Sequence, residues 1–208
     1  MTLSVWLAFL VASFVISLSP GAGAVYAMSC GMRGGYRHAL VGIVGMQFGL
    51  ALQLLVVAIG LGALLATSTL AFNIVKWVGV AYLVWLGWQQ FGAEPRVVAV
   101  DGGAPAVSAR GAFLRGFLVN ASNPKATIFF LAVVPPFIDP GRPLVPQYLA
   151  VMGTLAFTDL IVMSGYALLA SRVLRLLREP HHVRWMNRTF GGLFMLAGGL
   201  LATFKRGA

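Results

Sequence analysis

The sequence predicts an all-α polytopic membrane protein in which six transmembrane helices form two inverted-topology three-helix repeats, each with a broken first helix. Three observations predict this fold class. Hydrophobic residues make up 59% of the 208 residues, charged residues make up 10%, and the mean hydropathy is +0.88. Apolar stretches follow one another along the chain, and a proline interrupts the first stretch of each half. A soluble domain would need many more charges on its surface.

The apolar stretches are long enough to cross a membrane as helices. A bilayer core of about 30 Å requires about 20 helical residues. Stretches of this kind occupy residues 3–30, 39–66, 70–91, 113–137, 146–171 and 188–204. Glycines spaced four apart, as in Gly31-x-x-x-Gly35 and Gly45-x-x-x-Gly49, are expected to let these helices pack closely in lipid.

A polar segment divides the stretches into two sets of three. Its composition, which includes Glu94, Pro95 and Asp101, is typical of a flexible linker. We predict a first three-helix repeat at residues 1–92, a cytoplasmic linker at 93–112 and a second three-helix repeat at 113–208. Because three crossings are an odd number, the second set lies inverted relative to the first, as in many secondary transporters.

Pro20 and Pro124 occupy corresponding places in the two halves, half a chain length apart. A proline inside a helix removes one backbone hydrogen bond and clashes with the carbonyl four residues earlier, so the helices should break near Ile16 and Asn120. Gly87 and Gly191 match at the same offset, although apolar sequences match easily. Broken helices at corresponding places in two repeats indicate a transport site.

Polar residues gather around both predicted breaks. Ser17 and Ser19 precede the first proline, and Asn120, Ser122 and Asn123 precede the second. One interpretation is that they satisfy backbone groups freed by the prolines. The other is that they bind a ligand, because the half-helices after the two prolines begin with free N–H groups and positive dipole ends that suit a carboxylate.

Two ionisable residues lie deep in the predicted spans. Lys125 is about 18 Å along the fourth span and Asp159 about 20 Å along the fifth, at a rise of about 1.5 Å per residue. Each costs about 2.5–3.5 kcal/mol near the bilayer centre and needs a partner. They could form a structural ion pair. Alternatively, Asp159 exchanges a proton with the amine of a transported solute, with Lys125 assisting or pairing with it.

The chain has a net charge of +10, and its basic residues are distributed unequally between the two sides of the predicted topology. The loops after the first, third and fifth spans carry Arg33, Arg37, Arg96, Arg110, Arg115, Arg172, Arg175, Arg178, Arg184 and Arg188, and the other side carries Lys76, Arg142, Lys205 and Arg206. The positive-inside rule places the richer side in the cytoplasm and both termini outside. Contact with anionic membrane lipids explains the remaining basicity, and nucleic acid is not an expected partner, because the chain has no basic aromatic motif.

Several motifs together resemble the lysine-exporter (LysE/RhtB) family, which includes threonine and homoserine efflux proteins. The resemblance runs from Ser19 to about Gly198. It rests on Pro20-Gly21 with Gly31-x-Arg33-Gly34-Gly35, on Lys76-Trp77-x-Gly79-x-Ala81-Tyr82-Leu83-x-x-Leu86-Gly87, on Phe113-x-x-Gly116-Phe117-x-x-Asn120-x-x-Asn123-Pro124-Lys125-Ala126, and on Asp159 and Tyr166. It implies a six-helix inner-membrane exporter driven by the proton gradient, with no nucleotide, metal or other cofactor.

The chain departs from the family pattern at two places. The family's first motif commonly reads Pro-Gly-Pro-Asn, whereas this chain has Pro20-Gly21-Ala22-Gly23. Many relatives carry an acid on the second span where this chain has Leu50, with only Gln47 and Gln53 nearby. Proton coupling is therefore expected to run largely through Asp159.

These observations predict proton-coupled export of small amino acids or their derivatives, of the threonine, homoserine or lysine type, rather than an enzyme. The expected partners are the substrate, the proton gradient and membrane lipids, and a homodimer is one candidate assembly. Asp159 is the predicted proton-coupling residue. The predicted substrate-binding residues are Ser19, Pro20, Gly21, Asn120, Asn123, Pro124 and Lys125.

Other functions fit the sequence less well. Another small solute or a metal cation could be carried on the same fold, although the histidines, His38, His181 and His182, lie in or beside predicted cytoplasmic loops. A thiol redox carrier would need two cysteines, and the chain has only Cys30. A receptor without transport would have no use for broken helices.

Overall fold

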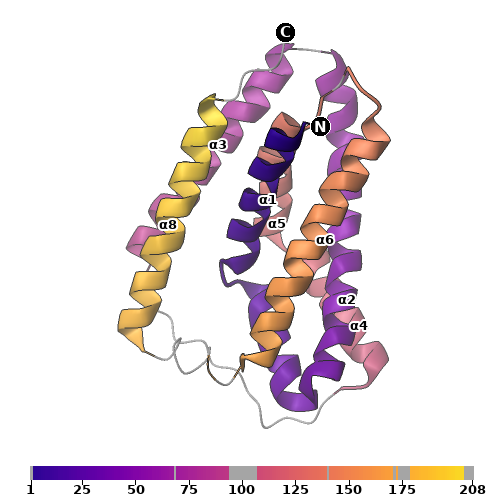
Figure 1. Cartoon of the computed structure of the whole chain (residues 1–208), viewed down its shortest axis with the longest axis vertical. Helices are drawn as coiled ribbons and strands as arrows, with labels where there is room; N and C mark the ends of the chain where they lie inside the picture. The colour runs from indigo at the N-terminus through magenta and orange to yellow at the C-terminus, as the bar shows by residue number, and fades with distance from the viewer. Residues whose placement is uncertain are drawn as a thin grey trace.

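The computed structural model describes residues 2–67, 69–93, 107–139, 141–170, 172 and 179–203, and the regular structure within them is all helical. The all-α class is thus confirmed for this part of the chain, and Figure 1 shows its long helices running side by side. The elements are α1 (Leu3–Leu18), α2 (Ala22–Thr67), α3 (Thr69–Gly92), α4 (Ala109–Ala121), α5 (Pro124–Val133), the 3-10 turn η1 (Pro135–Phe137), α6 (Leu144–Leu168) and α8 (Pro180–Thr203). Much of the predicted linker, with Arg96, and also Arg175, Arg178, Lys205 and Arg206 lie outside the described residues.

Both predicted helix breaks are present. α1 ends at Leu18 and α2 begins at Ala22, with Pro20 in the gap. α4 ends at Ala121 and α5 begins at Pro124, and the two helix axes differ in direction by 49°. Pro124 occupies the first turn of α5, where its missing N–H group is not needed.

α2 turns back on itself at Gly35. This residue has φ 71° and ψ −178°, a conformation that glycine adopts readily and other residues rarely do. The turn divides α2 into limbs at residues 22–34 and 36–67, which meet at the lower end of the molecule in Figure 1. The first limb continues the predicted first span and the second limb holds the predicted second span.

Glycines form the contacts between several helices. A Cβ atom on Gly45 or Gly49 would collide with the backbone of α4, and one on Gly31 would collide with the backbone of α6 at Ala167. The expected packing role is confirmed for these three residues. It is wrong for Gly35, around which a Cβ would meet nothing within 4 Å, because this glycine serves the turn instead.

α3 and α8 meet at Gly87 and Gly191. A Cβ on Gly87 would lie 2.6 Å from the carbonyl oxygen of Gly191, and one on Gly191 would lie 2.8 Å from that of Gly87. These two residues occupy equivalent positions in the predicted repeats. Mutual contact of equivalent residues is expected at the axis of a two-fold repeat, although the repeat itself stays a prediction.

The described helices provide two or three candidate membrane crossings. Ala22–Gly60 and Leu144–Leu168 are long and apolar enough, and the bent pair Ala109–Ala121 and Pro124–Phe137 can form a third. Leu3–Leu18 is a shorter apolar helix. The chain is therefore a helical protein with membrane-spanning character, and six crossings remain a prediction.

The two ends of the molecule differ in character. The Gly35 turn and the first residues of α4 and α8 lie at one end, which we call the Gly35 end, whereas α1 begins and α8 finishes at the opposite end (Figure 1). Segments at the Gly35 end carry Arg33, Arg37, Arg110 and Arg184. The helices thus bring together basic segments that the sequence assigned to one side of the membrane.

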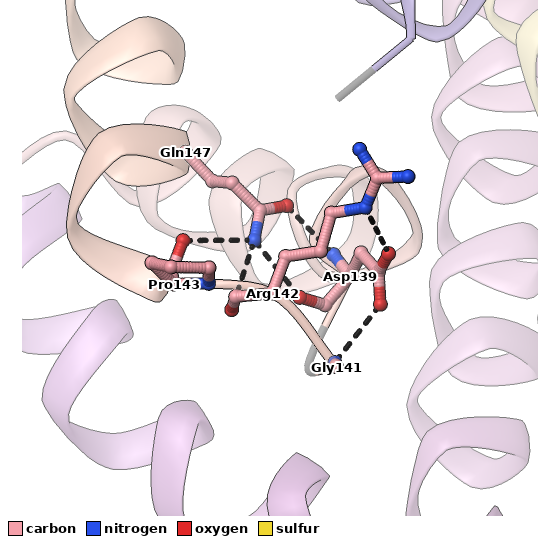
Figure 2. Close-up of polar contacts among 5 residues, drawn as sticks. All are labelled: Asp139, Gly141, Arg142, Pro143 and Gln147. Carbon is pink, nitrogen blue, oxygen red and sulfur yellow. Dashed lines mark hydrogen bonds and ion pairs between the residues drawn. The ribbon is translucent and has the colours of Figure 1, made fainter.

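The loop before α6, at the opposite end, is held by its own polar groups (Figure 2). The Gln147 amide accepts from the Asp139 N–H at 2.8 Å and donates to the carbonyls of Asp139, Arg142 and Pro143. The Asp139 carboxylate pairs with Arg142 at 3.2 Å and accepts from the Gly141 N–H at 2.9 Å. The acid and the base of this loop therefore neutralise each other.

Candidate substrate site at the helix breaks

A polar cavity of about 60 Å³ lies where the two helix breaks meet α6. Five of the seven predicted binding residues line it together with Asp159, whereas Pro20 and Pro124 create the breaks without lining the cavity. The lining residues are Ile16, Ser17, Ser19, Gly21, Gly23, Ala24, Met46, Leu50, Asn120, Asn123, Lys125, Ala126, Phe129, Phe130, Leu155, Asp159 and Met163. Residues that are far apart in the sequence thus share one small polar space.

The two asparagines support the second break. The Asn123 Oδ1 atom accepts from the Lys125 N–H at 3.1 Å and so caps the start of α5. The Asn120 Nδ2 atom donates to the Met46 carbonyl at 3.0 Å, which ties α4 to the second limb of α2. Their side chains therefore serve the fold and also border the cavity, and ligand binding by these residues stays a prediction.

Gln53 stabilises the second break, although it is distant from that break in the sequence. Its Nε2 atom donates to the Ala121 carbonyl at 3.2 Å, the Asn123 carbonyl at 3.1 Å and the Thr127 Oγ1 atom at 2.7 Å. These acceptors lie at and beside the gap between α4 and α5. No role for Gln53 was predicted from the sequence, although a glutamine inside an apolar span is itself a signal that a buried polar partner exists.

Lys125 and Tyr166 stabilise the first break. The Lys125 ammonium donates to the Ser19 carbonyl at 2.9 Å, and the Tyr166 hydroxyl donates to the Leu18 carbonyl at 2.7 Å. A cation at the C-terminal end of a helix also complements the helix dipole. Because Lys125 belongs to α5, it joins the first break directly to the second.

Asp159 is buried, with 7% of its surface exposed. Its Oδ2 atom accepts from the Gln47 Nε2 atom at 2.7 Å, and the Ser17 hydroxyl also hydrogen-bonds the carboxylate. The alternative of an ion pair with Lys125 is wrong in this structure, although both residues border the cavity. Lys125 instead satisfies a carbonyl that the first break leaves free, and neutral donors surround the carboxylate.

Three buried polar atoms in this region have no hydrogen-bond partner among the described residues. They are the Ser19 Oγ atom on the cavity wall, the Gln47 Oε1 atom beside Asp159 and the Gln53 Oε1 atom at the second break. A buried polar atom without a partner costs about 1–3 kcal/mol. A ligand that donates hydrogen bonds, such as an ammonium group, would remove part of this cost.

The described residues contain no group of three or more His, Cys, Asp or Glu side chains placed to hold a metal ion. His181 and His182 stack on each other at the start of α8, with ring centroids 5.7 Å apart. The sequence-based alternative of metal-cation transport therefore receives no support from this part of the chain.

Comparison with known proteins gives the family. The model of the LysE type translocator family matches residues 14–204. The chain belongs to this family. This agrees with the resemblance carried by the proline motifs.

Several relatives of this LysE type translocator are named as efflux proteins. The chain is 42% identical over 205 residues to the homoserine/homoserine lactone efflux protein of Salmonella typhimurium, with 99% of each chain covered. It is 43% identical over 205 residues to an uncharacterized membrane protein of Vibrio cholerae, covering 99% of this chain and all of the relative. A leucine efflux protein of Klebsiella pneumoniae is 26% identical over 203 residues, covering 96% of this chain and 95% of the relative. No solved structure gives a significant match.

Proposed function

We propose that this LysE type translocator exports small amino acids and their derivatives, of the homoserine type, across the cytoplasmic membrane in exchange for protons. One observation carries the proposal: the two helix breaks and the buried Asp159 enclose a single polar cavity. The names of full-length relatives, which are efflux proteins for homoserine, homoserine lactone and leucine, support the substrate class.

The amine of the substrate binds at Asp159 in this proposal. Homoserine and its lactone share an α-amino group, but only homoserine has a carboxylate, so a site that handles both must recognise the amine. The Asp159 carboxylate lines the cavity and supplies the acceptor for an ammonium group, and Gln47 donates to this carboxylate at 2.7 Å. Charge-assisted hydrogen bonds of this kind are about twice as strong as neutral ones.

The remaining part of the substrate faces the helix breaks. The Ser19 hydroxyl is unpartnered, and Gly21 and Asn123 immediately precede the half-helices that start at the two breaks. N–H groups at a helix start favour a carboxylate, and a hydroxyl can bond an ester or alcohol oxygen. Lys125 contributes its positive charge from the same wall while it holds the Ser19 carbonyl.

Proton exchange follows because the substrate ammonium group and a proton compete for the Asp159 carboxylate. Ionised Asp159 binds the substrate ammonium, and a proton that reaches Asp159 from outside neutralises the carboxylate and releases the substrate outward. Loss of that proton to the cytoplasm restores the ionised form for the next substrate. A cavity of about 60 Å³ holds about two waters at about 30 Å³ each, less than a four-carbon amino acid needs, so the half-helices must move apart during transport.

An efflux assay with three related compounds tests the amine requirement. Cells with and without the protein are preloaded with labelled homoserine, homoserine lactone or 4-hydroxybutyrate, which has the chain of homoserine without its amino group. We expect protein-dependent efflux of the first two compounds only. Efflux of all three at equal rates would rule out recognition of the amine, and efflux of none would rule out the homoserine substrate class.

A further inference from the structure

A second cavity adjoins the polar cavity at the helix breaks. It has a volume of about 110 Å³ and lies between α1, α3, α5 and α8. The described residues that line it are all apolar, and they include Val15, Leu83, Val133 and Phe194. We call this space the apolar cavity. Apolar cavities of about 150 Å³ stay free of water and can bind a benzene ring, so a space of this size suits a branched alkyl group.

Phe129 alone, among the described residues, lines both cavities. On α5, residues four apart share one helix face: Lys125 lines the polar cavity, Phe129 lines both and Val133 lines the apolar cavity. On α1, the neighbours Val15 and Ile16 line the apolar and the polar cavity respectively. The two cavities therefore follow one another along α1 and α5, and Phe129 stands where they meet.

The partition between the cavities is a single layer of side chains. The Phe129 ring is buried, with 3% of the residue exposed. The Lys125 ammonium of the polar cavity lies 5.7 Å from the centre of the Phe194 ring, which lines the apolar cavity. A cation at this distance from an aromatic ring makes a cation–π contact. Groups that line different cavities thus interact directly.

The polar cavity suits a short polar side chain. Its volume is only about 60 Å³, and the Ser19 hydroxyl on its wall has no partner among the described residues. A hydroxyl on the substrate can bond to Ser19, whereas an alkyl side chain needs an apolar space. The apolar cavity offers such a space, but the Phe129 ring separates it from the polar site.

We propose that Phe129 determines which side chains the transporter accepts, because its ring keeps the apolar cavity separate from the polar cavity. This inference rests on the proposed export function and adds a specificity-determining residue to it. With the ring in place, the site accepts short polar side chains such as that of homoserine. Without the ring the two cavities join, and the isobutyl group of leucine occupies the apolar cavity while its amine stays at Asp159.

Uptake into everted membrane vesicles tests this role, because an exporter fills such vesicles through its cytoplasmic face. The wild type is compared with Phe129→Ala, with the control Phe137→Ala, and with Phe129→Ala combined with Ala12→Leu. Phe137 is also buried, with 7% of its surface exposed, but it lines only the apolar cavity. Ala12 likewise lines only the apolar cavity, so the larger side chain of Ala12→Leu refills that space.

The measured quantity is the ratio of kcat/KM for leucine to kcat/KM for homoserine. We expect Phe129→Ala to raise this ratio about tenfold or more, because one methylene group in an apolar pocket already changes selectivity by about 10–200-fold. Phe137→Ala should keep the wild-type ratio, since it enlarges the apolar cavity without joining it to the polar site. Adding Ala12→Leu to Phe129→Ala should return the ratio towards the wild-type value. If Phe129→Ala does not reach the membrane, the milder Phe129→Leu replaces it with the same expected direction.

Three results would overturn the proposal. An unchanged ratio in the Phe129 variant would show that the apolar cavity is closed to substrates, for example because a lipid chain fills it. An equal rise in Phe137→Ala would indicate a general loosening of the helices. A rise that Ala12→Leu does not reverse would show that leucine uses the space left by the ring and not the apolar cavity.

A wild-type protein that does not carry homoserine would contradict the proposed function and not the role of Phe129. In that case the melting temperatures of the purified wild type and Phe129→Ala are measured with free leucine and with free glycine at equal concentration. The role of Phe129 predicts that leucine stabilises Phe129→Ala more than glycine does, and that the two amino acids act equally on the wild type. Equal effects of leucine and glycine on Phe129→Ala would overturn it.

Discussion

Single residues hold the broken helices together through contacts that the sequence does not reveal. The prolines predict helix breaks near Ile16 and Asn120, and the structure confirms a break close to each, after Leu18 and after Ala121. Side-chain donors from distant positions satisfy carbonyls at these breaks: Lys125 and Tyr166 act at the first break and Gln53 acts at the second. Proximity in the sequence favoured the serines and asparagines beside the prolines, because a sequence shows which groups are freed but not which side chains approach them.

Gln53→Leu tests this role at the second break. The substitution keeps the approximate size of the side chain but removes the donor to three acceptors, so it should destabilise the protein by about 1–3 kcal/mol. The thermal unfolding midpoint of the purified protein in detergent measures the effect. Gln89→Leu, at an exposed position of α3, is the matched control and should change the midpoint little. Equal midpoints for the two variants would contradict the role of Gln53.

The sequence predicted a depth for Lys125 and Asp159, but it could not predict their partners. Counting residues along a helix places both side chains near the membrane centre. It does not say which way a long lysine side chain extends. Lys125 extends to the Ser19 carbonyl, and Asp159 accepts from Gln47, to which the sequence assigned no role beyond its place near Leu50 on the second span.

At the scale of helices, one glycine spacing serves two different purposes. Gly31 meets the backbone of α6, whereas Gly35 adopts a positive φ and turns the chain. The sequence predicted packing for both, since a spacing of four residues says only that they share a helix face. The turn depends on a backbone conformation that this spacing does not encode.

Two alanine substitutions distinguish a packing glycine from a free one. Gly45→Ala places a methyl group against the Phe113 carbonyl and should separate α2 from α4, with a marked loss of thermal stability and of transport. Gly153→Ala on α6 meets nothing within 4 Å and should be neutral or slightly stabilising, because alanine favours helix by about 0.5–1 kcal/mol. Melting curves of the two purified variants provide the comparison. A more stable Gly45→Ala protein would contradict the close helix packing.

For the whole molecule, the sequence predicted the helical class and the separation of charge. Composition alone indicated a membrane environment. Of the arginines that the sequence assigned to one side, Arg33, Arg37, Arg110 and Arg184 lie on described segments that meet at the Gly35 end. The number of crossings depends on how the broken and turned helices sit in a bilayer. Helix length and hydropathy support two or three crossings directly. The prediction of six crossings also depends on the predicted inverted repeat.

Cysteine labelling on intact cells tests the predicted orientation. In a Cys30→Ser background, Arg37→Cys places a thiol at the Gly35 end and Gly141→Cys places one at the opposite end; both positions are exposed. The positive-inside rule predicts that a membrane-impermeant thiol reagent labels Gly141→Cys on intact cells and labels Arg37→Cys only after permeabilisation. The reverse pattern would invert the orientation, and labelling of both on intact cells would contradict the membrane arrangement.

The central claim is that Asp159 couples export to the proton gradient, and one measurement tests it most directly. Efflux of preloaded labelled homoserine is followed from cells with the wild-type protein or Asp159→Asn, at matched amounts in the membrane, with and without a protonophore. The asparagine keeps the shape of the side chain but can neither carry the charge nor exchange the proton. We expect the protonophore to abolish wild-type export, and Asp159→Asn cells to match cells that lack the protein. Export by Asp159→Asn at the wild-type rate, with the same response to the protonophore, would contradict the claim.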